Sequence, residues 1–314
     1  MMTCKPFSVL WIVCLLAALN GVHAQSQADS LKQLPQKGRD RRDSTVVVGE
    51  DGDLYIYKKP RPFAFVTQVP RTIAWSARAS VKKKSIVPLA LIAVSTVALI
   101  SVDQSVTDKV QQFGNYLGID PERSYGSSLA IQLGGFKATV YDVPKNFNTA
   151  VYSIGEGLTS VVLAGGLYAV GKIRNDYRAV QTASQILQVQ ITVGVIGQTI
   201  KRISGRESPF MASARGGVWR PFPGFSAYQN NTARYDAFPS GHLATMMATV
   251  TILAMNYPEK PWIRWVGGSV ITLVCFSMIN NDVHWAGDYP LALGIGYVTA
   301  RATVSMNRWV QHKK

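Results

Sequence analysis

Cysteine and histidine are both scarce in this sequence of 314 residues, which has three cysteines and four histidines. Cys4 and Cys14 lie within residues 1–24, where Lys5 precedes an apolar core and small residues, a pattern typical of a secretory signal peptide. Cleavage would leave Cys275 alone, and a single cysteine cannot form an internal disulfide. The sequence therefore predicts an exported cell-envelope protein held together by packing. The alternative is that residues 1–24 stay as an uncleaved anchor.

Acidic residues are also few, with 18 Asp and Glu against 33 Lys and Arg and a formal net charge of +15 at pH 7. This balance favours anionic partners such as lipid headgroups or phosphate esters. Nucleic acid is the competing partner for a basic chain. The sequence contains no nucleic-acid-binding motif, and its basic residues flank apolar segments, so we expect no nucleic-acid partner.

Residues 25–84 lack the apolar content needed for a core, and we expect a polar leader there. Within it, two apolar runs at 46–48 and 54–57 flank the turn-like residues 50–53, which predicts a small hairpin. The remainder of this extension is expected to be short and irregular.

Long apolar segments begin at residue 86. The first, at 86–102, follows three lysines and is the strongest candidate for a membrane span. The others are residues 150–171, 179–200, 243–255, 266–279 and 289–304. They predict an all-α bundle of about six core helices over residues 85–306, partly or wholly membrane-embedded, followed by a basic tail at 307–314.

The mean hydropathy of +0.08 is low for six lipid-facing helices. Segment 179–200 also holds five glutamines, which are costly in a bilayer unless they face the bundle. A soluble or peripheral bundle therefore remains an alternative.

Basic residues also predict the orientation of the bundle. Positive charge collects at Lys172, Arg174 and Arg178 and again at Arg301 and Arg308, which places both regions in the cytoplasm. The catalytic loops would then face outside. A cleaved signal makes this count of crossings fail by one, unless 86–102 does not cross fully, 129–140 inserts, or the signal is retained.

The chemistry is expected in residues 201–288, which contain two of the four histidines. Ser240 and Gly241 precede His242 and an apolar run, which predicts a helix capped by Ser240 with its amides pointing at an anion. His284 and Asp288 are four residues apart, so a helix would place them on one face with Asp288 orienting the imidazole.

Cations stand just before this region in the segment KRISGRESP at residues 201–209. Lys201 and Arg206 follow an apolar run and could reach the same anion. The three segments together predict a phosphate site, with acid–base chemistry carried by His242 and His284.

This order of motifs resembles the phosphatidic acid phosphatase type 2 and haloperoxidase superfamily, whose signature is K-x6-RP, PSGH and SR-x5-H-x3-D. The matching segments are KRISGRESP (201–209), PSGH (239–242) and SMINNDVHWAGD (277–288). The resemblance implies a helical bundle, a phosphohistidine on His284 oriented by Asp288, and proton donation by His242. It also implies phosphate binding by Lys201, Ser240 and Gly241.

Two signature arginines are replaced, by Ser208 and Met278. Each arginine–phosphate contact contributes about 1.5–3 kcal/mol, so the loss of both without replacement would slow catalysis strongly. Arg206 is the expected substitute, and the arginines of the following loop are further candidates, namely Arg215, Arg220 and Arg234.

The leading hypothesis is a metal-independent envelope phosphatase, without cofactor, acting on a phosphomonoester or pyrophosphate of a lipid. Three alternatives stay open. They are a non-catalytic phosphate- or lipid-binding protein, a soluble periplasmic nonspecific acid phosphatase that cleaves small phosphate esters, and a vanadate-dependent haloperoxidase.

Overall fold

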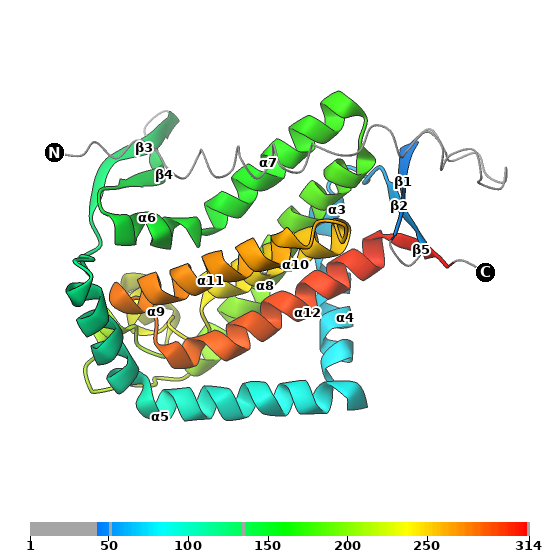
Figure 1. Ribbon diagram of the computed structural model, residues 1–314. Helices are drawn as coiled ribbons and strands as arrows, with labels where there is room; N and C mark the ends of the chain where they lie inside the picture. Colours follow the sequence, from blue (N-terminus) through cyan, green and yellow to red (C-terminus); the bar gives the residue numbers. More distant parts are fainter. Residues whose placement is uncertain (1–42, 50–51, 134–135, 313–314) are drawn as a thin grey trace.

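The computed structural model describes residues 43–49, 52–133 and 136–312. The expected signal peptide at 1–24 and the first part of the polar leader lie outside the described residues. The described chain is mainly helical, with two small antiparallel sheets at its margins (Figure 1).

Six long helices form the body, as the apolar segments predict. They are α5 (Ile86–Tyr116), α7 (Gly157–Arg174), α8 (Tyr177–Ser204), α10 (Gly241–Asn256), α11 (Trp262–Asn280) and α12 (Tyr289–Asn307). Shorter helices are α3 (Ala64–Thr67), α4 (Val69–Ser80), α6 (Phe147–Ile154) and α9 (Phe225–Asn230), with 3-10 turns at η3 (Lys83–Ser85), η4 (Pro209–Met211), η5 (Thr232–Arg234) and η6 (Ala286–Asp288).

Helix α10 lies at the centre of the bundle and packs against α7, α8, α11 and α12. Apolar residues surround it on most sides, and Leu243, Ala248 and Ile252 are completely buried. A helix that is apolar all round is stable only when other helices cover it. The central position of α10 follows from this sequence pattern.

Three of the five glutamines of α8 are buried in the bundle, namely Gln181, Gln185 and Gln188, whereas Gln190 is half-buried and Gln198 is exposed. Gln188 donates a hydrogen bond of 2.7 Å to Thr72, and Gln185 accepts one of 2.5 Å from Asn256. Both glutamines are about 1% exposed. Pairing of buried amides removes most of the cost of placing them in an apolar core.

The expected N-terminal hairpin is present as β1 (Ser44–Val48) and β2 (Leu54–Lys58). Strand β2 also pairs with β5 (Trp309–Gln311), so the basic tail completes a three-stranded antiparallel sheet with order β1-β2-β5. Tyr57 is fully buried below this sheet and donates to the Asn256 carbonyl at 3.0 Å. The sheet therefore closes the end of the bundle where α10 ends.

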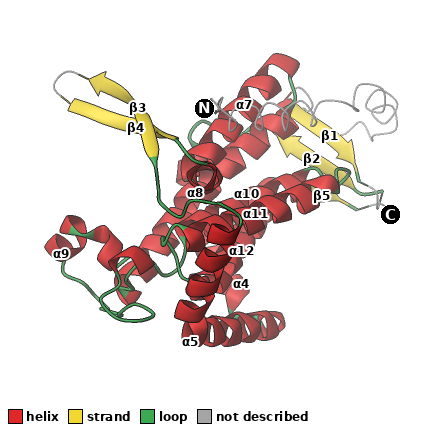
Figure 2. Ribbon diagram, turned by 60° about the vertical axis from the view of Figure 1, so that its left-hand side comes forward, coloured by secondary structure: helices red, strands yellow, loops and turns green. Residues whose placement is uncertain are grey.

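Residues 129–140 do not form the inserting segment that was one way to balance the crossings. They belong to a second hairpin, β3 (Tyr125–Leu133) with β4 (Phe136–Pro144), which projects from the bundle (Figure 2). Ser128 and Asp142, which flank this segment, pair across the hairpin at 2.5 Å.

Two helices of the described chain are long and apolar enough to cross a membrane, α5 with η3 (Lys83–Tyr116) and α11 (Trp262–Asn280). Helices α6 and α7 would form a third span if they act together, although they meet at a bend of 59°. These spans make the bundle at least partly membrane-embedded.

Candidate active site

The two histidines of the central motifs meet at one end of the bundle. His242 is the second residue of α10, and His284 lies in the connection between α11 and α12. Their ring centroids are 5.8 Å apart and their planes are inclined by 74°. This separation leaves both rings within reach of one phosphate-sized group.

Asp288 fixes the orientation of His284. Its Oδ2 atom lies 3.3 Å from His284 Nδ1 and accepts a hydrogen bond of 2.9 Å from the Trp285 amide. His284 is 4% exposed and Asp288 is fully buried. A carboxylate on Nδ1 leaves Nε2 as the unprotonated nitrogen, which is the form that a nucleophile needs.

The sequence spacing would place His284 and Asp288 on one face of a helix, but this segment is not an α-helix. Helix α11 ends at Asn280, Asp282 takes a left-handed φ of 57°, and only the short turn η6 precedes α12. The two side chains meet because this loop folds back on itself, not because a helix repeats every four residues.

Ser240 caps α10 as expected. Its Oγ accepts from the Leu243 amide at 3.5 Å, and its own amide donates to the Asp288 carbonyl at 3.1 Å. The second bond joins the two histidine-bearing segments directly. The first-turn amides of Gly241 and His242 have no partner within the helix, so they are available to an anion.

Lys201 reaches the same place from the last turn of α8. A Cβ atom added to Gly241 would lie 3.8 Å from Lys201 Nζ, so the ammonium group stands beside the start of α10. Asp236 holds it at 3.5 Å, and the lysine is 8% exposed. Its charge is thus buried, partnered and close to His242.

Arg206 does not fit the phosphate contact that the sequence predicts. Its NH1 donates to Asp288 Oδ1 at 2.7 Å and its NH2 to Asp103 Oδ2 at 2.5 Å. Trp219 and Trp285 cover the guanidinium, 4.9 and 5.5 Å from the ring centroids, and the side chain is 0% exposed. Both guanidinium arms are thus occupied by carboxylates, one of which is the Asp288 that orients His284.

Asp103 completes this buried network and escaped the sequence analysis. It lies in α5, is 1% exposed, and accepts from the Gly287 amide at 2.8 Å as well as from Arg206. An ionisable residue directly after the first candidate span was the available signal, since such residues usually have a buried partner.

The positions of the missing arginines hold no cation. Met278 is fully buried with its sulfur 3.8 Å from Ser240 Oγ, and Ser208 is 3% exposed. The loop arginines are engaged elsewhere. Arg220 and Arg234 lie against Glu207, and Arg215 contacts Asp108 at 3.3 Å.

Glu207 is the anchor of that loop. It is fully buried, and its carboxylate accepts from the amides of Ser213 at 2.9 Å and Val218 at 3.0 Å. Burial alone would raise the pKa of Glu207, but these amides and the Arg220 guanidinium outweigh it and lower the pKa.

Arg123 supplies a cation that no motif indicates. It is half-buried in the connection between α5 and β3, and its guanidinium carbon lies 4.5 Å from the Phe210 ring centroid. Phe210 is two residues beyond Ser208, and its amide donates to the Asp282 carbonyl at 3.0 Å. Arg123 therefore approaches the site from the side where Ser208 leaves it uncharged.

The positive charges act together on His242. Burial lowers the pKa of His242 to about 3, with further lowering by His284, Lys201 and Arg123. The imidazole is therefore neutral at neutral pH. An anion among these groups would reverse the effect of the cations.

Comparison with known proteins gives a family match over part of the chain. Residues 183–311 match the model of the PAP2 superfamily. The matched range includes every site residue that the sequence predicts, from Lys201 to Asp288, whereas Asp103 and Arg123 precede it.

Two individual proteins are similar over different extents. The lipid A 1-phosphatase of Porphyromonas gingivalis is 34% identical over 62 residues, which is 19% of this chain and 14% of that protein. The match therefore spans only a small part of that relative. The transmembrane PAP2-type phosphatidylglycerolphosphate phosphatase of Bacillus subtilis aligns in structure over 78% of this chain and 96% of its own, with 13% identity and a TM-score of 0.38.

Proposed function

We propose that this protein is a PAP2-type phosphatase of the cell envelope that hydrolyses a phosphomonoester or pyrophosphate of a lipid. The supporting observation is the pair of imidazoles 5.8 Å apart, one of them backed by a buried carboxylate. The PAP2 match over the same residues and the candidate membrane spans support a phosphatase that works at a bilayer.

In the proposed reaction, His284 Nε2 attacks phosphorus while the bond from phosphorus to the leaving oxygen breaks. His242 gives its proton to that oxygen, and Asp288 stabilises the positive charge on His284 through Nδ1. Water then attacks the phosphohistidine, His242 takes the proton of that water, and phosphate leaves. The reaction needs no metal, because the imidazole itself is the nucleophile.

The neutral state of His242 fits this sequence of steps when substrate binding changes its protonation. Lys201, Arg123 and His284 disfavour the imidazolium. A phosphate carrying two negative charges neutralises them and favours protonation of His242. Substrate binding would thus convert His242 to its protonated form, which is the general acid.

Arg123 is our candidate for the cation that Ser208 and Met278 do not provide. Lys201 and the first-turn amides of α10 would hold two phosphate oxygens, and Arg123 would bind a third. Arg206 serves as a positioning residue, because both of its guanidinium arms are occupied by Asp288 and Asp103.

The test is phosphate release by the full chain in mixed micelles, with a lipid phosphate and with a small soluble ester. We expect His284→Ala to abolish turnover, the wild type to prefer the lipid, and a chelator to change nothing. Quenching in alkaline detergent should trap labelled phosphate that is stable to base and released by acid on the wild type, and none on His284→Ala. Equal turnover by wild type and His284→Ala would remove the catalytic proposal.

Arg123→Ala should lower kcat/KM by about 10- to 150-fold, the equivalent of one charge-assisted contact of about 1.5–3 kcal/mol. Arg215→Ala is the matched control, because Arg215 is 74% exposed and pairs with Asp108 at the surface. Equal effects of the two substitutions would remove Arg123 from the site while leaving the role of His284 intact.

A further inference from the structure

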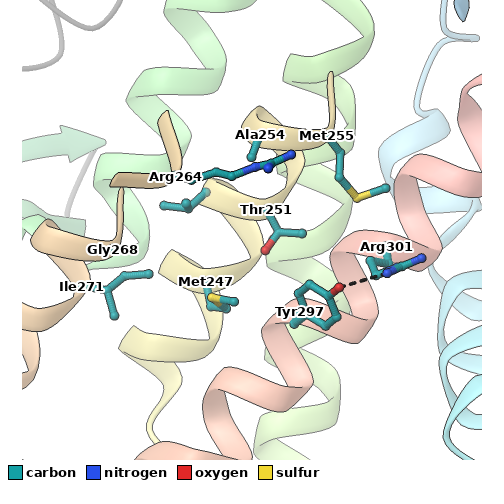
Figure 3. Close-up of a pocket in the computed structure, with 10 residues that line it drawn as sticks. Met247, Thr251, Ala254, Met255, Arg264, Gly268, Ile271, Tyr297 and Arg301 are labelled. Carbon is teal, nitrogen blue, oxygen red and sulfur yellow. Dashed lines mark hydrogen bonds between the residues drawn. The ribbon is translucent and has the colours of Figure 1, made fainter. Parts of the chain in front are cut away.

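A hollow lies along α10 between Met247 and Met255. It has a volume of about 470 Å³ and runs between α11 and α12, which both pack on α10 (Figure 3). Its floor is formed by Met247 and Thr251 of α10, and Gly268 and Ile271 of α11 form one wall. The lining is largely apolar and opens along the outside of the bundle.

Two arginines stand at the mouth of this groove. Figure 3 shows Arg264 extending from α11 over Ala254, and Arg301 on α12, where its NH1 donates to the Tyr297 hydroxyl at 2.9 Å. Both arginines are exposed. Within the described ranges, neither forms an ion pair with an acidic side chain, so two positive charges face the groove without a counter-ion.

The residues beside the groove indicate where it would lie in a membrane. Arg264 lies in the first turn of α11, a candidate span, beside Trp265, which is 79% exposed. Tryptophan and arginine at a helix end are typical of the headgroup region. From Arg264, helix α11 runs past Gly268 to Ile271, which lies about 10 Å closer to the centre of the bilayer.

We propose that this groove binds one anionic phospholipid, with its phosphate between Arg264 and Arg301 and an acyl chain along Gly268 and Ile271. The apolar lining suits a hydrocarbon chain, and the unpaired arginines suit a headgroup of net negative charge. Among the residues that the structure describes, no acidic side chain lines the groove to receive the ammonium group of a zwitterionic lipid.

This lipid is distinct from the proposed substrate. His242 is at the first turn of α10, whereas Ala254 is twelve residues further along the same helix, or about 18 Å away. A lipid bound at the groove thus cannot place its phosphate between the histidines. Its effect would be on the anchoring of α11 and α12.

Gly268 allows the groove to be filled without disturbing the arginines. A Cβ atom at this position meets nothing within 4 Å, so Gly268→Leu would project into the open hollow. Leucine is also the better helix former, which makes unfolding an unlikely consequence of the change. The variant tests the acyl-chain position separately from the charges.

The experiment measures lipid bound to the purified full chain by native mass spectrometry, after reconstitution with phosphatidylglycerol or with phosphatidylcholine. We expect one phosphatidylglycerol to be retained and phosphatidylcholine to be lost. Arg264→Ala with Arg301→Ala should weaken retention roughly 30-fold, at about five-fold per arginine. Gly268→Leu should weaken it with both arginines present.

Arg71→Ala with Arg78→Ala is the matched control. These exposed arginines on α4 remove the same charge without lining the groove. The proposal fails if this control loses lipid as strongly as the groove variants, if both groove variants retain it, or if phosphatidylcholine is held equally well. Because no turnover is measured, these results are independent of the proposed phosphatase activity.

Discussion

Removal of Arg206 should destabilise the protein more than any other single change near the site, because this cation lies between two buried carboxylates. Its guanidinium lies between Asp103 at 2.5 Å and Asp288 at 2.7 Å, and all three side chains are 0% exposed. Arg206→Met keeps much of the volume but leaves two buried carboxylates facing each other. Breaking a buried ion pair in this way costs about 3–5 kcal/mol, a large part of a typical total stability of about 5–15 kcal/mol.

The stability changes caused by substituting Arg206 and Asp103 should not add, because the same buried charges are involved in both. Asp103→Asn in the Arg206→Met background removes one of the two uncompensated charges, and asparagine can still accept from the Gly287 amide. We therefore expect the double variant to be more stable than Arg206→Met alone by about 1–3 kcal/mol, although it carries more substitutions. Asp103→Asn alone should destabilise the wild type.

Denaturant unfolding of the detergent-solubilised protein gives the stability, and phosphate release gives the activity. Arg206→Met should also lower kcat, because one of the remaining carboxylates takes up a proton and Asp288 no longer fixes His284. The control is Arg178→Met, which breaks a pair with Glu259 at 2.7 Å at the opposite end and should reduce stability without reducing kcat. Additive losses in the Arg206 and Asp103 double variant would refute the shared-charge argument.

Three further results are expected. The folded pKa of His242 is about 3, below the ordinary 6.5 of the unfolded chain, so its contribution to stability is complete above pH 6.5 and is lost toward pH 3, by at most about 1.4 kcal/mol per pH unit. Unfolding at several pH values should show this loss in the wild type and not in His242→Gln. Met278→Arg should increase phosphate release less in the wild type than in Arg123→Ala, where a cation is missing; an equal gain would mean that Arg123 does not serve the phosphate. Gly205→Ala should cost roughly 2–5 kcal/mol in thermal unfolding, because the Cβ atom would lie 1.7 Å from the Arg220 carbonyl oxygen at a φ of +57°, whereas Gly118→Ala, at a φ of +68° with nothing within 4 Å, should cost only about 1 kcal/mol.

Apolar segments of the sequence predict the long helices well, because a helix packed on several sides needs apolar residues over its whole length. The cap at Ser240 is also a local feature, and the four residues at 239–242 were enough to predict it. The pairing of His284 with Asp288 was expected on a helix and occurs in a loop instead. The four-residue spacing indicated that His284 and Asp288 act together. The loop that brings them together depends on Asp282 and on contacts with distant segments of the chain.

Contacts between distant segments could not be predicted. Asp103 and Arg206 are 103 residues apart, and no periodicity links an acidic residue of α5 to the loop after α8. The sequence placed Arg206 on the phosphate because it stands two residues from a missing arginine. Two buried carboxylates determine its position instead, and Arg123 lies in the connection between α5 and β3, where no motif marks it.

The N-terminal sheet bears on how the chain is placed in the membrane. Thr45 accepts from the Tyr177 amide at 2.9 Å, and Tyr57 donates to the Asn256 carbonyl, so this sheet lies where α10 ends. The histidines lie where α10 begins. If the bundle crosses the bilayer, an exported N-terminal segment and an external active site exclude each other.

For a bundle that crosses the bilayer, the distribution of basic residues favours the external active site over the exported N-terminal segment. Lys172, Arg174 and Arg178 lie at the sheet end, as do the arginines of the groove, and an excess of basic residues marks the cytoplasmic side. We expect the site to face outside and the sheet to face the cytoplasm, with residues 1–24 not exporting the segment that follows. In a cysteine-free background, an impermeant maleimide applied to intact cells should label Phe225→Cys near the site and spare Ile173→Cys, which is as exposed at the sheet end. Labelling of Ile173→Cys alone would reverse the orientation, and labelling of both would show that the bundle does not cross.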